Sequence, residues 1–226
     1  MRARKKKNTV PRLERCENYL SDKVEINENT RFRLEVGCGK GKFITEVATK
    51  PENKDIVFYA VEKVPDVMVM AAEKAAAAEI GNLQFILGDA ETLPEICPPH
   101  RAEIIYLNFS DPWPRKKQAK RRLTYRSFLE IYRGLLSDDG YIFMKTDNQK
   151  LFDYSLEEIE THGYELFDVT RDLHNSGIYN PATTEYEDRF TALGQPIYSL
   201  KARPIPGYVP QPEPEKKDDD DSSDEE

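Results

Sequence analysis

The sequence has few of the residues on which several classes of protein depend. Its 226 residues include only three cysteines, three histidines and one tryptophan. Cys16, Cys38 and Cys97 are odd in number and share no metal-ligand spacing, which argues against a disulfide framework or zinc site and predicts a reducing cytoplasm. No run approaches the roughly 20 apolar residues of a spanning helix, and the basic start leads into no apolar stretch. We therefore expect no membrane span, signal peptide or metal.

Negative charge is abundant but confined to one end of the chain. The formal net charge is −8. Residues 213–226 hold nine acidic side chains and two lysines, so they carry −7 and the other 212 residues carry −1. Because residues 204–226 are rich in proline and acid and offer little to bury, we predict a disordered tail there. The predicted organisation is a basic extension over 1–30, a domain over 31–203 and this tail.

Short apolar runs alternate with helical patterns along the body of the chain. The predicted strands are 32–36, 56–61, 83–87, 104–108 and 141–145. The predicted helices are 42–49, 66–80, 125–136 and 151–160. This alternation predicts an α/β doubly wound, mostly parallel sheet, with ligands bound beyond the carboxyl ends of the strands.

A glycine cluster follows the first predicted strand. Gly37, Gly39 and Gly41 permit a tight turn and close approach of a ligand to the backbone. A dinucleotide site would place its third glycine at position 42, where this chain has Lys42. The tighter spacing resembles the loop that holds the methionine part of S-adenosylmethionine, although a purely structural turn stays open.

Acidic residues lie close to this loop and to the next strand ends. Glu35 precedes the glycines and could meet a cofactor ammonium. Glu62 ends the second predicted strand and could accept both ribose hydroxyls of an adenosine. Asp89 follows the third and could bind the adenine amino group or cap a helix. Three acids suit a cofactor that is cationic at sulfur and amine better than they suit a pyrophosphate.

The fourth predicted strand leads into a stiff loop and a basic run. Two prolines flank Trp113, the only tryptophan, two residues after Asp111. Six of the eight residues 115–122 are basic. A run of charge is usually only a solvated face, but a cationic strip beside an aromatic stacker favours phosphate contacts to RNA or DNA.

These segments together resemble the bacterial tRNA (guanine-N7-)-methyltransferases of the TrmB type. The pair formed by Ser-Asp-Pro-Trp-Pro at 110–114 and Lys-Arg-Arg-Leu-Thr at 120–124 is the most specific part of a resemblance that spans about 31–200. It implies a Rossmann-like class I methyltransferase fold, with a mostly parallel seven-stranded sheet, helices on both faces and a reversed last strand. It also implies S-adenosyl-L-methionine as cofactor and the variable-loop guanine of tRNA, position 46, as methyl acceptor.

The resemblance also implies a role for each matching residue. The implied cofactor contacts are Glu35, Gly37, Gly39, Gly41, Glu62, Asp89 and Asp111. Asp111 also takes the catalytic place. The implied substrate contacts are Arg115, Asp147, Thr184, Glu185, Tyr186 and Glu187. The basic run itself, independently of the resemblance, supplies the expected tRNA contacts Lys117, Lys120, Arg121 and Arg122. Arg115 stands where the family usually has lysine, so a planar fork replaces a point charge.

The expected chemistry is simple because guanine N7 carries a lone pair and no proton. A general base is not required; alignment and nearby carboxylates suffice. Two alternatives stay open: methylation of an exocyclic base amine, and a non-catalytic RNA-binding protein on the same fold. A dehydrogenase is more distant, and the sequence leaves monomer and homodimer undecided.

Overall fold

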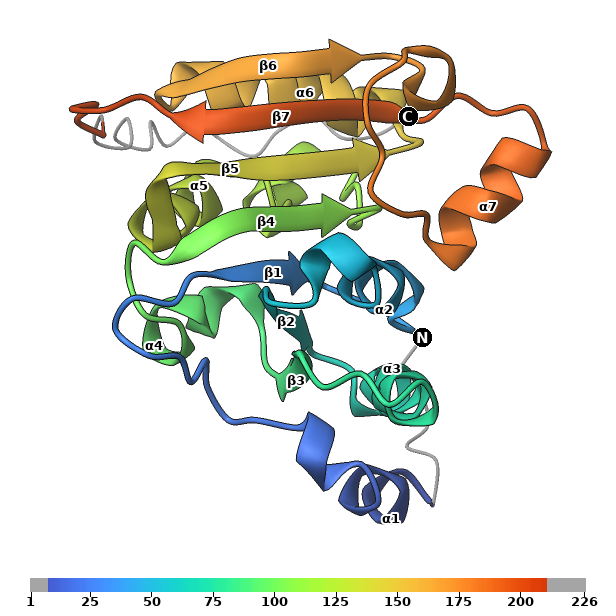
Figure 1. Ribbon diagram of the computed structural model, residues 1–226. Coiled ribbons are helices and arrows are strands. Elements are labelled where there is room, and N and C mark those ends of the chain that lie inside the picture. Colours follow the sequence, from blue (N-terminus) through green and yellow to red (C-terminus); the bar gives the residue numbers. More distant parts are fainter. Residues whose placement is uncertain (1–7, 211–226) are drawn as a thin grey trace.

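A seven-stranded sheet forms the centre of the computed structural model, which describes residues 8–210 (Figure 1). The strand order is β3-β2-β1-β4-β5-β7-β6. The strands are β1 (Phe32–Val36), β2 (Val57–Glu62), β3 (Leu83–Leu87), β4 (Ala102–Asn108), β5 (Leu136–Thr146), β6 (Tyr164–Thr170) and β7 (Tyr198–Pro204). Strand β7 runs antiparallel to both of its neighbours, whereas β1 to β5 pair in parallel. The predicted Rossmann-like sheet with a reversed last strand is therefore confirmed.

Helices cover both faces of this sheet (Figure 1). On one face lie α1 (Thr9–Glu14), α2 (Lys42–Ala48) and α3 (Pro65–Ala77). On the other lie α4 (Leu93–Ile96), α5 (Arg126–Leu135) and α6 (Gln149–Thr161). Successive β2 residues alternate between the two cores: Phe58 packs in the first and Tyr59 in the second. Because both faces are covered, most residues of the central strands are apolar and buried.

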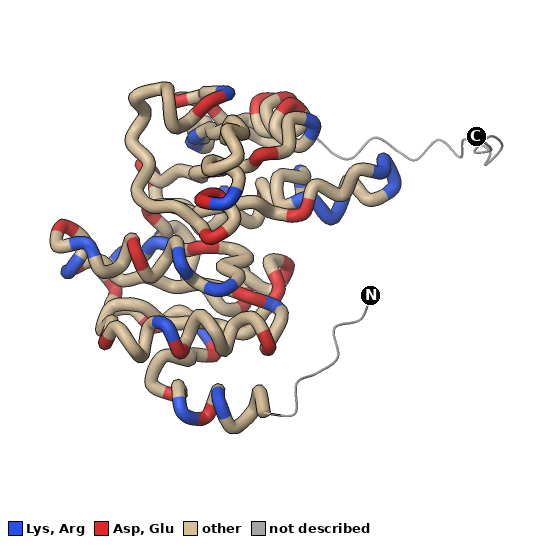
Figure 2. Tube along the Cα trace, turned by 90° about the vertical axis from the view of Figure 1, so that its right-hand side faces the viewer, with Lys and Arg blue, Asp and Glu red and all other residues tan. Residues whose placement is uncertain are grey.

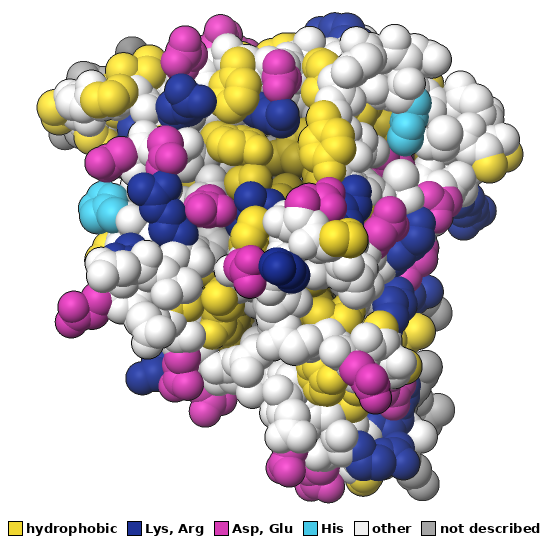
Figure 3. All heavy atoms as spheres, viewed as in Figure 1, with side chains coloured by type: hydrophobic (Ala, Val, Ile, Leu, Met, Phe, Trp, Pro, Cys, Tyr) yellow, Lys and Arg dark blue, Asp and Glu magenta, His cyan; other side chains and the backbone are white. Residues whose placement is uncertain are grey.

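The part of the sheet formed by β5, β7 and β6 carries helices on one side only (Figure 1). On the other side hydrophobic side chains reach the surface (Figure 3). The ammonium of Lys201 lies 5.7 Å from the ring centroid of Tyr141 and 6.0 Å from that of Phe167. This long side chain thereby covers aromatic surface that no helix covers.

The residue pattern predicted most of these elements, with shifted ends. Strand β5 begins at Leu136 rather than at residue 141, directly after α5. The short helices α1 and α4 were not predicted. Nor were β6, β7 and α7 (Glu185–Ala192), the helix at the carboxyl edge of the sheet (Figure 1). The longer elements that the pattern missed therefore all lie in the last third of the domain.

Both flanks of the domain pack against it within the described range. The guanidinium of Arg12 in α1 forms two hydrogen bonds with the carboxylate of Glu73 in α3, at 2.7 and 2.5 Å. Pro204 ends β7, and beyond it the hydroxyl of Tyr208 donates to the carbonyl oxygen of Thr161 at 3.2 Å. The chain thus stays packed past the boundary predicted at 204. The acidic run over 213–226 lies outside the described residues, and the domain limits stay a prediction.

Candidate active site

The predicted acidic residues gather at one edge of the sheet. Glu62 is the last residue of β2, and Glu35 is the last but one of β1. Asp89, Asp111 and Asp147 follow β3, β4 and β5. Because these strands are parallel, their carboxyl ends meet at this edge, as expected for a ligand site in an open α/β sheet.

A cavity of about 280 Å³ opens at this edge. The predicted site residues that line it are Gly37, Glu62, Asp89, Asp111 and Arg121. Asn108, Phe109 and Trp113 complete its β4 side. The other predicted site residues do not line this cavity. The predicted site residues therefore form two groups, one that lines the cavity and one outside it.

The glycine loop leaves open space at two of its three glycines. Gly37 and Gly39 have φ of 76° and 58°, and a Cβ on either would meet no atom within 4 Å. At Gly41, with φ of 76°, a Cβ would lie 2.6 Å from the Cβ of Ala71 in α3. The first two glycines thus face free volume, whereas Gly41 allows α2 to pack on α3. Its predicted cofactor contact stays a prediction.

Glu62 fixes the glycine loop from the neighbouring strand. Its carboxylate accepts hydrogen bonds from the backbone N–H of Gly39 at 3.0 Å and of Val64 at 2.9 Å. A carboxylate has about four acceptor positions, so Glu62 keeps capacity for ligand hydroxyls while it holds the loop.

Glu35 is buried with half of its carboxylate unpaired. The side-chain amide of Asn108 donates to Glu35 Oε1 at 2.7 Å, and Oε2 has no partner among the described residues. Burial raises the pKa of Glu35 to about 8. The side-chain amide oxygen of Asn108, Oδ1, is also buried without a partner in the described part of the chain. Sequence reasoning did not assign Asn108, although a polar residue ending a buried strand is a signal for such a role.

Asp89 and Asp111 line the cavity and are also exposed to solvent. Asp89 lies 3.8 Å from the ammonium of Lys63, and its side chain does not cap the following turn. Asp111 is exposed and is followed by Trp113, whose φ is 41°. The guanidinium of Arg121 lies 4.5 Å from the Trp113 ring centroid. One face of the ring expected to stack a base is therefore covered by Arg121.

The basic run projects from this edge of the molecule. Figure 2 looks at the edge and shows Lys and Arg gathered on a segment that extends away from the sheet. Arg115, Lys117 and Lys120 are exposed on or beside the turn η4 (Lys116–Arg121). Arg122 differs, because its guanidinium donates to the carbonyl oxygens of Pro112 and Trp113.

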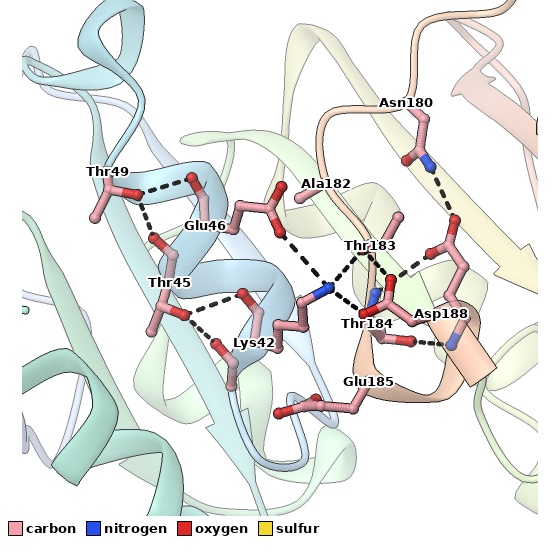
Figure 4. A network of polar contacts seen from close by, with 12 residues as sticks. Lys42, Thr45, Glu46, Thr49, Asn180, Ala182, Thr183, Thr184, Glu185 and Asp188 are labelled. Atoms are coloured by element: carbon pink, nitrogen blue, oxygen red, sulfur yellow. Dashed lines mark hydrogen bonds and ion pairs between the residues drawn. The ribbon is translucent and has the colours of Figure 1, made fainter. Parts of the chain in front are cut away.

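Helix α7 is held across the glycine loop by polar contacts (Figure 4). The ammonium of Lys42 at the start of α2 pairs with Asp188 and with the hydroxyl of Thr183. Lys74 of α3 pairs with Glu185 at 2.6 Å. The side chain of Thr184 accepts the N–H of residue 187 and so forms a capping box that starts the helix.

Glu187 does not lie on the cavity. Its carboxylate and the ammonium of Lys145 are 2.6 Å apart, and both side chains are 0% exposed. Asn180 and His174 also contact this carboxylate, at 2.8 and 3.1 Å. The predicted substrate contact of Glu187 therefore stays a prediction, whereas its observed place is a buried anchor for α7.

Tyr186 and Asp147 meet beside the cavity. The hydroxyl of Tyr186 donates to Asp147 at 3.3 Å. Its ring stacks on Phe190 with centroids 4.3 Å apart and lies 5.2 Å from the ring of Phe109, which lines the cavity. The structure thus joins two predicted substrate residues to the cavity wall.

Comparison with known proteins identifies the family. Residues 29–200 match a family model described as "Putative methyltransferase". The tRNA (guanine-N(7)-)-methyltransferase of Clostridioides difficile (strain 630) is 40% identical over 213 residues, which cover 90% of this chain and 99% of that protein. The enzyme of the same name from Bacillus subtilis (strain 168) is 44% identical, with 76% and 79% covered. The chain belongs to the tRNA (guanine-N(7)-)-methyltransferase family.

Solved structures of other methyltransferases have the same fold as this member of the tRNA (guanine-N(7)-)-methyltransferase family. A 16S rRNA methyltransferase, KamB, matches with a TM-score of 0.60 at 14% identity, over 86% of this chain and 93% of that one. A likeness at this identity concerns the fold alone. The predicted family and fold are both confirmed.

The cofactor implied by the family is S-adenosyl-L-methionine, and the residues present fit it. Open space at Gly37 and Gly39 leaves room for a ligand against the backbone. The unpaired, buried Oε2 of Glu35 offers an acceptor to an ammonium. Glu62 and Asp89 line the adjoining cavity. Over residues 8–210, no group of three or more His, Cys, Asp and Glu side chains is placed to hold a metal, and no helix is long and apolar enough to cross a membrane.

Proposed function

We propose that this chain transfers the methyl group of S-adenosyl-L-methionine to N7 of a guanine in tRNA, at position 46 of the variable loop. The observation that carries the proposal is a shared cavity: Asp111 lines the same cavity as Gly37 of the glycine loop and Glu62. A methyl donor held by that loop and a base facing Asp111 would occupy one space. The tRNA (guanine-N(7)-)-methyltransferases similar to this chain supply the substrate class.

The residues of the chain need only align the base and favour the charge that develops on it. When bound, S-adenosylmethionine supplies an electrophilic methyl group on a cationic sulfur. Guanine N7 would attack the methyl carbon with its lone pair while the carbon–sulfur bond breaks and its electron pair goes to the sulfur. The ring would become cationic, so no proton has to be removed. Asp111 and Asp147 supply negative charge for this ring and accept hydrogen bonds from the guanine N–H groups. Glu35 and Glu62 would hold the amine and the ribose of the cofactor.

The projecting basic run is the proposed contact with the tRNA backbone. We expect the double variant Lys116→Ala/Lys117→Ala to weaken tRNA binding and to lower the slope of log K against log salt by about 0.7–0.9 for each phosphate that is no longer neutralised. Both lysines are exposed. Filter binding over a salt series measures the slope. An unchanged slope would mean that these lysines only face solvent.

The activity is tested with unmodified tRNA transcripts and labelled S-adenosylmethionine. Transfer to the wild-type transcript, absence of transfer to one with adenine at position 46, and strand scission by borohydride and aniline together support the proposal. A neutral N-methyl product would indicate the exocyclic amine instead. Cofactor binding without transfer would favour a non-catalytic RNA-binding protein. The tRNA substrate and three buried free cysteines support a cytoplasmic location.

The buried carboxyl of Glu35 predicts proton release when the cofactor binds. Since burial raises its pKa to about 8, Glu35 holds its proton at pH 7, and the cofactor ammonium favours the ionised form. Calorimetry at pH 7 in buffers of different ionisation enthalpy should show release of up to one proton per cofactor. Glu35→Gln should abolish it, and equal release by this variant would contradict the assignment.

The same pKa predicts how stability depends on pH. The folded protein holds the Glu35 proton up to about pH 8, whereas the unfolded chain loses it near 4.5. The stabilising contribution of the neutral form is complete below about 4.5 and is lost as the pH rises through 8. Urea unfolding of wild type and Glu35→Gln across this window measures it, and the variant should show the shallower dependence.

A further inference from the structure

Arg122 belongs to the basic run in sequence but not in its contacts. Its side chain is half-buried, whereas Arg115, Lys116 and Lys117 are exposed. Its Nε donates to the carbonyl oxygen of Pro112 at 3.1 Å, and its Nη2 donates to that of Trp113 at 2.9 Å. The guanidinium therefore spans two successive peptide carbonyls, which suits a planar fork and not a point charge.

The loop that Arg122 holds is strained and poor in hydrogen-bond donors. Trp113 has φ of 41°, a left-handed conformation that is unfavourable for a non-glycine residue and persists only where the surroundings impose it. Pro112 and Pro114 have no N–H to donate. Phe109, at the start of the same segment, also has a positive φ, of 51°. The guanidinium of Arg122 supplies donors from outside this segment.

A second contact ties Arg122 to the framework. Its guanidinium lies 4.2 Å from the ring centroid of Tyr154 in α6. Close by in the chain, the hydroxyls of Thr124 and Ser155 are 2.7 Å apart and both residues are buried. Arg122 thus lies between a rigid helix and the loop that carries Asp111.

We propose that Arg122 is a positioning residue, which fixes the Asp-Pro-Trp-Pro loop so that the Asp111 carboxylate faces the cavity. The catalytic role of Asp111 in this inference rests on the proposed function. The contacts by which Arg122 holds the loop, here called the clamp, do not depend on it. The positioning role reassigns Arg122 from the tRNA contacts to the frame of the active site. A misplacement of about 1 Å in such a site can cost about 10²-fold in rate.

Two variants separate positioning from phosphate binding. Arg122→Lys keeps the positive charge but not the planar fork, and Arg122→Gln loses both. A clamp predicts that both variants lower kcat by about 10- to 100-fold, while the tRNA dissociation constant stays within about a factor of three of wild type and the salt slope is unchanged. Lys117→Gln is the matched control for a phosphate contact, with a raised KM for tRNA and a lower salt slope.

Fluorescence reports on the loop without any assay of activity. Trp113 is the only tryptophan, so its emission and acrylamide quenching report on this loop alone. Both Arg122 variants should increase quenching, as should Tyr154→Leu to a smaller degree. Tyr154→Phe, which keeps the ring, should resemble wild type. Lys117→Gln should leave quenching unchanged.

The outcomes are separable. If Arg122→Lys retains wild-type kcat and quenching while Arg122→Gln weakens tRNA binding and lowers the salt slope, Arg122 is a phosphate contact and the inference is overturned. Unchanged quenching in both variants would overturn it as well. If the wild type fails to methylate tRNA but the quenching changes occur, the clamp stands and the proposed function falls. Should Arg122→Gln fold poorly, the lysine and Tyr154 variants still decide.

Discussion

Asp111→Asn is expected to lower the rate of methyl transfer by about 10²-fold or more, because it removes the negative charge that stabilises the guanine ring as it becomes cationic. Asparagine keeps the size and some hydrogen-bonding capacity of the side chain, so the effect concerns charge. Single-turnover transfer with saturating tRNA and cofactor is the measurement. Asp111 is exposed, so the melting temperature should not change.

Asp138→Asn is the matched control for the removal of one carboxylate. Asp138 is exposed near the start of β5, far along the strand from the carboxyl edge. It should transfer methyl groups at the wild-type rate. Near-normal turnover by Asp111→Asn would remove Asp111 from the catalytic role, whatever the cofactor affinity.

Lys145→Met is expected to lower the free energy of unfolding by about 3–5 kcal/mol, because it leaves a buried carboxylate without its counter-charge. Lys145 donates to Glu187, to Asn180 and to the carbonyl oxygen of Ala182, at 2.6, 3.1 and 2.8 Å. Urea unfolding measures the decrease. The start of α7 should also become more accessible to proteolysis, since Lys145 is its buried anchor.

A second pair of variants tests whether burial is the reason for this large loss of stability. Arg31→Met breaks an ion pair with Asp139 whose side chains are 45% and 71% exposed, and it should cost less than about 1 kcal/mol. The double variant Lys145→Met/Glu187→Leu removes both buried charges and should recover much of the stability. A decrease in Lys145→Met as small as that in Arg31→Met would contradict a buried, uncompensated carboxylate.

The first half of the fold follows from apolar runs, and the last third does not. In strands β1 to β5 most residues are apolar and buried, which is why these strands could be predicted. In β6 most residues are half-buried or exposed, and β7 contains Lys201, Arg203 and Pro204. Helix α7 begins with acidic residues, and Glu187 is its one buried residue. Its capping box, Thr184 with Glu187, was nevertheless a usable signal for a helix start.

The candidate site divides in the same way. The positions of the acidic residues could be predicted from the ends of the strands, because parallel strands bring their carboxyl ends together. Partners could not be predicted, because a charged residue looks the same in a sequence whether it meets solvent or protein. Arg122 resembled its neighbours in the run, yet it binds main-chain carbonyls. The sequence also did not show that Glu187 pairs with Lys145. Asn108 is a polar residue at the end of a buried strand, but the sequence does not show that it donates to Glu35.

The reversed strand β7 has a consequence for synthesis on the ribosome. It lies between β5 and β6 and pairs with both. Strands β5 and β6 are synthesised earlier, so they lack this shared partner until β7 leaves the ribosome. Lys42 and Asp188, which hold α7 over the glycine loop, are 146 residues apart in the chain. A nascent chain that ends before residue 198 therefore has exposed strand edges that can pair with other chains. The enzyme is expected to fold only after release of nearly its whole length, and C-terminal truncations into β7 should aggregate rather than yield a smaller active domain.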